Sequence, residues 1–172
     1  MLRAGKPLAC GTPRIALVYI ERVQIGRALM SDTRPLGVGG TLVKRGCGLA
    51  PAIQIVTPLP AAIAIHGDGK PTTLTIGARS YELQAGGRVA VQLPAGTTRV
   101  TTDAGASAFV VALDTPYYAL TDAAGRYRLD ELAPGAYQLT IWQPPVTATA
   151  EPTISKRTVR VESRGTTRVD IR

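Results

Sequence analysis

Apolar and polar residues alternate over short segments of this chain, and glycine or proline residues separate the segments. The densest apolar segment spans residues 15–23 and is rich in β-branched side chains. No window shows the i, i+3, i+4, i+7 apolar spacing of an amphipathic helix. Side chains on a strand point alternately to the two faces of a sheet, so this pattern is typical of short β-strands. The sequence therefore predicts an all-β protein.

Further strands are expected along most of the chain. They are predicted over residues 37–44, 53–56, 61–65, 74–76, 80–83, 88–93 and 109–111. The 53–56 and 61–65 segments are joined by Thr57-Pro58-Leu59-Pro60, which indicates a hairpin. A closing hairpin is predicted from 155–162 and 166–171, with Val159 and Val161 facing inward.

Residues 113–142 predict a β-meander of three short strands and two tight turns. Asp122 and Gly125 belong to the first turn, where aspartate bonds its own backbone and glycine supplies a positive φ. Pro134-Gly135 forms the second. Between the turns, Tyr127 and Leu129 fall on one face of the expected middle strand. Such a meander needs a second layer over its apolar face.

The turn residues of this segment resemble those of carboxypeptidase regulatory-like domains, which have a transthyretin-like β-sandwich. The matching residues are Thr121-Asp122, Gly125 with Tyr127 one position late, and Pro134-Gly135-Ala136-Tyr137. The preceding segment 110–118 resembles the junction, in a group of bacterial periplasmic proteins, where a cupredoxin-like copper domain continues into such a module. Earlier in the chain, Gly46-Cys47, Pro51 and Asp68 match the cupredoxin-like pattern, whereas Arg45, Ala52 and His66 depart from it.

The resemblance implies two closely associated antiparallel β-sandwiches, one cupredoxin-like and one transthyretin-like. Residues 1–36 are expected to form a lead-in and the first strand, 37–113 the cupredoxin-like domain, and 114–172 the carboxypeptidase regulatory-like domain. The first strand could join either sandwich, and pairing across to the second is one of the two alternatives.

The resemblance also tests whether copper chemistry is present. A type 1 copper centre needs two imidazoles and a thiolate, usually with a weak thioether. The positions that correspond to these ligands are occupied by Thr72, Val100, Asp103 and Ala106. None of these side chains can form the centre, and the chain has only one histidine. We therefore expect a scaffold that has lost type 1 copper, with no metal and no cofactor.

No catalytic constellation can be assigned. His66, the sole histidine, lies two residues before Asp68, but no motif places a serine or cysteine nucleophile nearby. Residues 67–70 lack the spacing of a phosphate-binding loop. The protein is expected not to be an enzyme.

The chain is basic, with 20 Lys and Arg against 12 Asp and Glu, for a formal net charge of +8. Such a charge attracts nucleic acid, anionic lipid or acidic polysaccharide without selecting among them. Most of the basic residues are arginines, which codon bias in a GC-rich genome would equally produce. Nucleic acid is not the expected partner, because basic and aromatic residues do not interleave on one face. Tyr117, Tyr118 and Trp142 form either part of the core or an exposed carbohydrate platform.

Two cysteines, Cys10 and Cys47, either pair in an oxidising compartment or remain separate buried thiols. The periplasmic resemblance favours the disulfide. Residues 15–20, the longest apolar run, are too few to span a membrane, and residues 1–10 lack the apolar core of a signal peptide. The resemblance implies a periplasmic or cell-surface location. The expected function is a non-enzymatic binding or structural module of the bacterial cell envelope, with a protein partner or self-association. The alternative is a carbohydrate-binding module.

Overall fold

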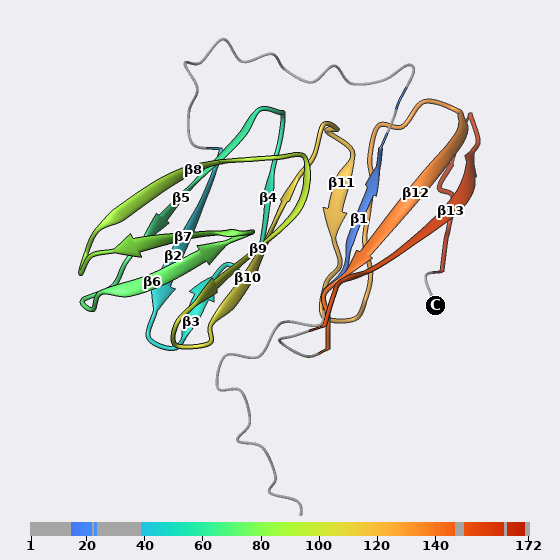
Figure 1. The fold of residues 1–172 in the computed structure, drawn as a ribbon. Helices are drawn as coiled ribbons and strands as arrows, with labels where there is room; N and C mark the ends of the chain where they lie inside the picture. The colour runs from blue at the N-terminus through green and yellow to red at the C-terminus, as the bar shows by residue number, and fades with distance from the viewer. Residues whose placement is uncertain (1–14, 22, 24–38, 147–149, 164, 171–172) are drawn as a thin grey trace, which may run out of the picture. The chain divides into compact units, whose positions relative to one another are not determined.

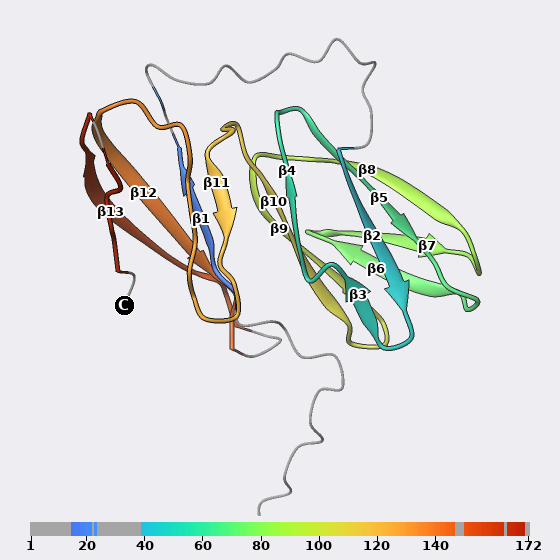
Figure 2. The ribbon, with the colours of Figure 1, turned by 180° about the vertical axis from the view of Figure 1, so that it is seen from behind.

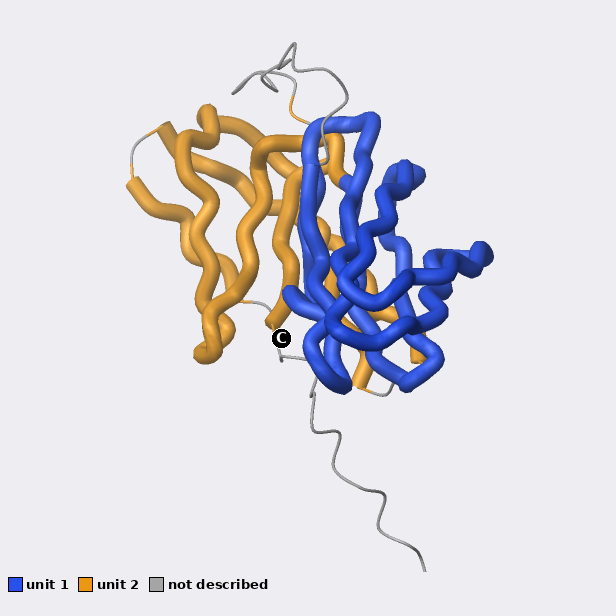
Figure 3. The backbone as a smooth tube through the Cα atoms, turned by 90° about the vertical axis from the view of Figure 1, so that its left-hand side faces the viewer, with its two compact units in different colours: residues 1–13, 34–112 blue, residues 14–33, 113–172 orange. Residues whose placement is uncertain are grey.

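The computed structural model describes residues 15–21, 23, 39–146, 150–163 and 165–170. These residues form thirteen strands and no helix, which confirms the all-β class. None of them therefore belongs to a helix that could cross a membrane. The chain divides into two compact units, shown in Figure 3: unit 1 comprises residues 1–13 and 34–112, and unit 2 comprises residues 14–33 and 113–172.

Unit 1 contains two sheets (Figure 1). The five-stranded sheet has the order β4 (Ile53–Val56), β10 (Ser107–Ala112), β9 (Gly96–Thr102), β6 (Thr72–Ile76) and β7 (Arg79–Leu83). The four-stranded sheet has the order β3 (Gly48–Ala50), β2 (Gly40–Arg45), β5 (Ala61–His66) and β8 (Arg88–Leu93). One pair in each sheet, β4 with β10 and β2 with β5, is parallel, so the sheets are mixed and not wholly antiparallel as predicted.

A single hydrophobic core joins the two sheets of unit 1. Leu42 and Ile63 of the four-stranded sheet and Leu74, Val100 and Val110 of the five-stranded sheet are fully buried in the same cluster. These side chains alternate with more exposed residues along most of their strands, as the period-two pattern predicts. The two sheets therefore pack face to face, and burial of apolar surface holds them together.

The predicted hairpin of the 53–56 and 61–65 segments is wrong. β4 pairs with β10, whereas β5 lies between β2 and β8 in the other sheet. The proline-containing connection 57–60 thus carries the chain from one sheet to the other. The burial of these segments does not alternate strictly, because Ile53 and Val56 are buried in β4 and Ile63, Ala64 and Ile65 are all buried in β5. A pattern of apolar residues does not specify the neighbouring strand.

Unit 2 contains one antiparallel sheet with the order β11 (Tyr118–Leu120), β1 (Leu17–Ile20), β12 (Gly135–Gln143) and β13 (Thr153–Val161). Figure 2 shows these strands side by side. The first strand of the chain therefore belongs to unit 2, where it lies between β11 and β12. Its register places Val18 opposite Ala119 on one side and opposite Ile141 on the other.

The predicted meander is wrong in its middle strand and in its strand order. β1 lies between β11 and β12, and residues 126–130 form no strand. Tyr127 and Leu129 are nonetheless half-buried, as their shared face predicted. Burial, followed by the negative charge of Asp170, raises the pKa of the Tyr127 phenol, whereas Arg157 of β13 lowers it. The phenol is thus near residues at the β13 side of the sheet.

Only the first strand of the predicted closing hairpin forms among the described residues. β13 pairs with β12 over its whole length, but residues 166–170 are not in a strand. Two side-chain bonds hold the returning segment beside β13. The Thr167 hydroxyl donates to the Arg160 carbonyl at 3.1 Å, and Arg157 Nη1 donates to the Asp170 carbonyl at 2.9 Å. Ile171, the last residue of the predicted second strand, lies outside the described residues.

Candidate functional site

The four positions that correspond to copper ligands divide into a hydrogen-bonded pair, the buried Thr72 and the exposed Asp103, and a pair within the apolar core. Thr72 begins β6, and its hydroxyl donates a hydrogen bond of 2.5 Å to Asp103 Oδ1 in the turn after β9. Val100 is fully buried and Ala106 is 6% exposed, and both belong to the core of unit 1. The structure therefore brings Thr72 and Asp103 together and packs the other two side chains into the sandwich.

A hollow of about 410 Å³ lies at Thr72 and Asp103. Its walls include Lys44, Lys70, Thr72, Asp103 and Ala104. Lys44 and Lys70 are cationic, Asp103 is anionic, and the hydroxyl of Thr72 donates its hydrogen bond to Asp103. No group of three or more His, Cys, Asp or Glu side chains that could hold a metal ion occurs in the part of the chain that the structure describes.

Lys44 and Asp68 form a largely buried ion pair beside this hollow. The Lys44 side chain is 7% exposed and that of Asp68 is 26% exposed. Lys44 Nζ donates to both carboxylate oxygens of Asp68, at 3.0 and 2.9 Å, and the Lys70 backbone N–H donates to Oδ1 at 3.0 Å. The hydrogen bonds from Lys44 and then from Lys70 lower the pKa of Asp68. Asp68 therefore ties the turn after β5 to the end of β2.

Asp103 is held in its ionised form by hydrogen bonds. The bond from the Thr72 hydroxyl, followed by one from the Thr73 backbone, lowers the pKa of the Asp103 carboxyl. Because the folded pKa lies below the unfolded value, the bonds to Asp103 stabilise the fold above pH about 4. That stabilisation is lost as the pH falls through the folded pKa.

We expect Thr72→Val to raise the pKa of Asp103 towards its ordinary value of about 3.9. The substitution keeps the shape of the side chain and removes the hydroxyl that donates to Asp103. Carboxyl NMR titration measures the pKa directly. Thr73→Val is the matched control, because the Thr73 hydroxyl donates to Glu82 instead, at 3.0 Å. An unchanged Asp103 pKa in Thr72→Val would contradict the role assigned to this bond.

His66 ends β5, opposite Arg88 of β8 and beside Val43 of β2. Asp68, the residue weighed as its catalytic partner, bonds to Lys44 and Lys70. The Asp68 carboxylate therefore holds the end of β2 and its own turn together.

The aromatic side chains do not form an exposed platform. Tyr117 is 3% exposed and Trp142 is 1% exposed, whereas Tyr118 is 37% exposed. A carbohydrate platform needs exposed rings side by side, and two of the three rings are buried in the described structure. Trp142 and Tyr117 are core residues of unit 2, because the hydrophobic effect favours burying such large apolar surfaces.

Cys47 lies in the exposed turn between β2 and β3, and its sulfur takes part in a disulfide. Cys10 lies outside the described residues, so the Cys10–Cys47 pairing stays a prediction.

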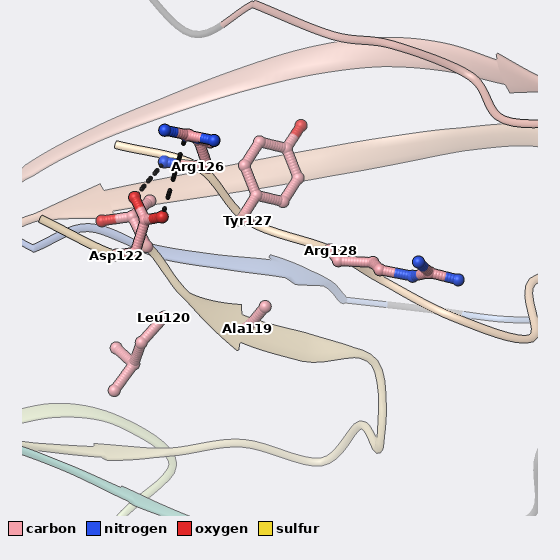
Figure 4. Close-up of a pocket in the computed structure, with 7 residues that line it drawn as sticks. Ala119, Leu120, Asp122, Arg126, Tyr127 and Arg128 are labelled. Atoms are coloured by element: carbon pink, nitrogen blue, oxygen red, sulfur yellow. Dashed lines mark hydrogen bonds and ion pairs between the residues drawn. The ribbon is translucent and has the colours of Figure 1, made fainter. Parts of the chain in front are cut away.

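A second hollow of about 410 Å³ lies in unit 2 beside β11 (Figure 4). It is lined by Ala119, Leu120, Thr121, Asp122, Arg126, Tyr127 and Arg128. The Asp122 backbone N–H donates to the Arg126 carbonyl at 2.8 Å, and Asp122 Oδ1 accepts from the Ala124 and Arg126 N–H groups at 2.9 and 2.8 Å. The sequence predicts this turn but not the hollow, because the alternation over residues 126–130 predicts a strand there.

The turn at Asp122 and the Gly135 that opens β12 are the features that carried the resemblance to a known family. Gly125 has a φ of 78°, as the turn was expected to require. Residues 95–172 match the carboxypeptidase regulatory-like domain. This carboxypeptidase regulatory-like match includes three strands of the unit 2 sheet but not β1, which lies at residues 17–20. Comparison with curated proteins and with solved structures found no match.

Proposed function

We propose that this protein is a non-enzymatic binding or structural module of the bacterial cell envelope, with a cupredoxin-like scaffold that has lost type 1 copper. The observation that carries the proposal is the occupancy of the four ligand-equivalent positions. Thr72 and Asp103 are bonded to each other, and Val100 and Ala106 contribute to the core. These side chains occupy the positions at which the resemblance puts the copper ligands.

Two of the residues that match the cupredoxin-like pattern have structural roles in unit 1. Asp68 holds the buried Lys44 ammonium, and Gly46 adopts a positive φ of 56° in the turn between β2 and β3. Such a division, with scaffold residues kept and ligand residues replaced, is what loss of a metal from a retained fold would leave. The replacement of the ligand residues supports a function in which the protein binds a partner through its surface and does not carry out redox chemistry.

The remaining parts of the proposal have separate supports. The carboxypeptidase regulatory-like match favours a non-catalytic β-sandwich module. The envelope location rests on the resemblance to periplasmic proteins, and a disulfide at Cys47 suits an oxidising compartment. A protein partner is favoured over a carbohydrate, because Tyr117 and Trp142 are buried.

Copper titration tests the loss of the metal centre. We expect the natural protein to develop no intense visible absorption band with Cu(II), because no histidine or cysteine occupies the four positions. The variant with Thr72→His, Val100→Cys, Asp103→His and Ala106→Met restores the ligand types and is expected to develop one.

A thiolate band in the natural protein would overturn the proposal. A folded quadruple variant that binds copper without the band would contradict the placement of the ligand positions. The variant with only Val100→Cys is the matched control for nonspecific thiol binding.

A further inference from the structure

We propose that the outer edge of β11 accepts an extended segment of a protein partner as an added strand, and that apolar residues alternate with acidic residues in this segment. This inference rests on the proposed function as a binding module and names the surface and the partner's chemistry. Strand addition of this kind uses backbone hydrogen bonds for affinity and side-chain contacts for selection.

The hydrogen bonds between β11 and β1 show which backbone groups face outward. The Ile20 N–H donates to the Tyr117 carbonyl at 3.0 Å, and the Thr121 N–H donates to the Ala16 carbonyl at 2.9 Å. In an antiparallel pair, alternate residues bond to the same neighbour. Tyr118 and Leu120, which lie between the bonded positions, therefore direct their N–H and C=O groups to the outer edge. β11 is the first strand in the order of the described sheet, so no described strand of unit 2 lies beyond it.

The turn after β11 does not continue along this edge. Asp122, two residues after β11, donates one backbone hydrogen bond to the Arg126 carbonyl within the turn. Residues 126–130 then form no strand, and the hollow opens between them and β11 (Figure 4). These residues pass over the face of the unit 2 sheet, where the Tyr127 phenol lies near Arg157 of β13, so the hollow lies over the face of β11 that carries Ala119. An extended segment beside β11 would reach the outward groups of Tyr118 and Leu120 and would border this hollow.

The side chains of β11 are unusual for an edge. Soluble proteins commonly protect edge strands with charges or proline. Tyr118 is 37% exposed and Leu120 is 39% exposed, and they account for two of the four large hydrophobic side chains exposed in the described structure. Being two residues apart on one strand, they point to the same face. Apolar side chains at alternate positions of an added strand would pair with them.

The charges at the hollow favour a carboxylate on the other face of the added strand. Two arginines, Arg126 and Arg128, and one aspartate, Asp122, line it. The arginine side chains are 83% and 85% exposed, and Arg126 Nε lies 3.9 Å from Asp122 Oδ2. Arg128 bonds to Asp130 through Nε. A guanidinium carries five N–H donors, so both arginines retain donors for a partner carboxylate.

The test selects peptides from a displayed random library on the purified full-length protein and measures the affinity of the selected peptides by fluorescence anisotropy. We expect them to contain alternating apolar residues and at least one Asp or Glu. Leu120→Pro should weaken binding about tenfold or more, because proline removes the outward N–H and blocks the edge. Proline is tolerated at edge strands, and thermal unfolding verifies that the variant folds.

Leu120→Ala separates backbone from side-chain recognition. It keeps the N–H and should weaken binding less than Leu120→Pro does. Ile154→Ala is the matched control, because Ile154 is a 56% exposed apolar residue on β13, at the opposite edge of the sheet. Arg128→Glu should weaken the binding of acidic peptides more than the binding of neutral peptides.

Three results would overturn the inference: selection of no peptide, equal binding by the natural protein and Leu120→Pro, or equal losses in Leu120→Pro and Leu120→Ala. Self-association abolished by Leu120→Pro would make a second copy the occupant and would overturn the assignment to a partner segment. Cross-linking in the envelope fraction tests the proposed function separately. A partner captured equally by the natural protein and Leu120→Pro would keep that function and reject the β11 site.

Discussion

Replacing Trp142 by alanine is expected to lower the free energy of unfolding by about 3–5 kcal/mol. The indole is 1% exposed on β12, in the centre of the unit 2 sheet, so its removal loses apolar contacts and leaves a cavity. Urea denaturation of the natural protein and the variant measures the loss.

Tyr118→Ala is the matched aromatic control. Because Tyr118 is 37% exposed at the sheet edge, its removal should cost less than about 1 kcal/mol. A Trp142→Ala variant of unchanged stability that had lost binding to a polysaccharide would restore the carbohydrate platform as the better interpretation.

Asp68→Asn is expected to lower the melting temperature by roughly 5–10 °C. The substitution leaves the ammonium of Lys44, whose side chain is only 7% exposed, without its anionic partner. An uncompensated charge in a poorly hydrated position is costly, whereas the intact pair is nearly balanced between desolvation and attraction. Differential scanning calorimetry measures the shift.

Lys44→Met and the double variant Lys44→Met with Asp68→Asn complete the cycle. Lys44→Met leaves the Asp68 carboxylate unpaired, but this group is 26% exposed and can be hydrated. Lys44→Met should therefore lower the melting temperature less than Asp68→Asn does. The double variant should recover much of the loss seen in Asp68→Asn. If Lys44→Met cost as much as Asp68→Asn, the buried cation would not be the source of the effect.

The alternation of apolar residues predicted strands well because it depends only on which side chains are buried. Residues 80–83 and 88–93 were placed within one or two positions of β7 and β8. Tyr127 and Leu129 were correctly assigned to one face, yet their segment is not in the sheet. An extended segment that packs over a sheet and a strand within it have the same alternation, so the pattern could not separate them.

Strand order could not be read from local sequence. β1 lies between β11 and β12, and this position depends on the fit between side chains of segments that are far apart in the chain. The local sequence of each strand does not specify its neighbours. For the same reason the β11 edge was missed. The proximity of Thr72 to Asp103 was implied by their common place in the copper-site pattern. The hydrogen bond between them required the three-dimensional structure.

The position of β1 has a consequence for biosynthesis. Ala16, just before β1, bonds to the Thr121 hydroxyl, 105 positions later in the chain. During translation, β1 therefore emerges long before either of its neighbouring strands, whereas the strands of unit 1, residues 40–112, all become available in one continuous stretch. The residues of β1 have no neighbouring strand of their sheet until β11 has left the ribosome.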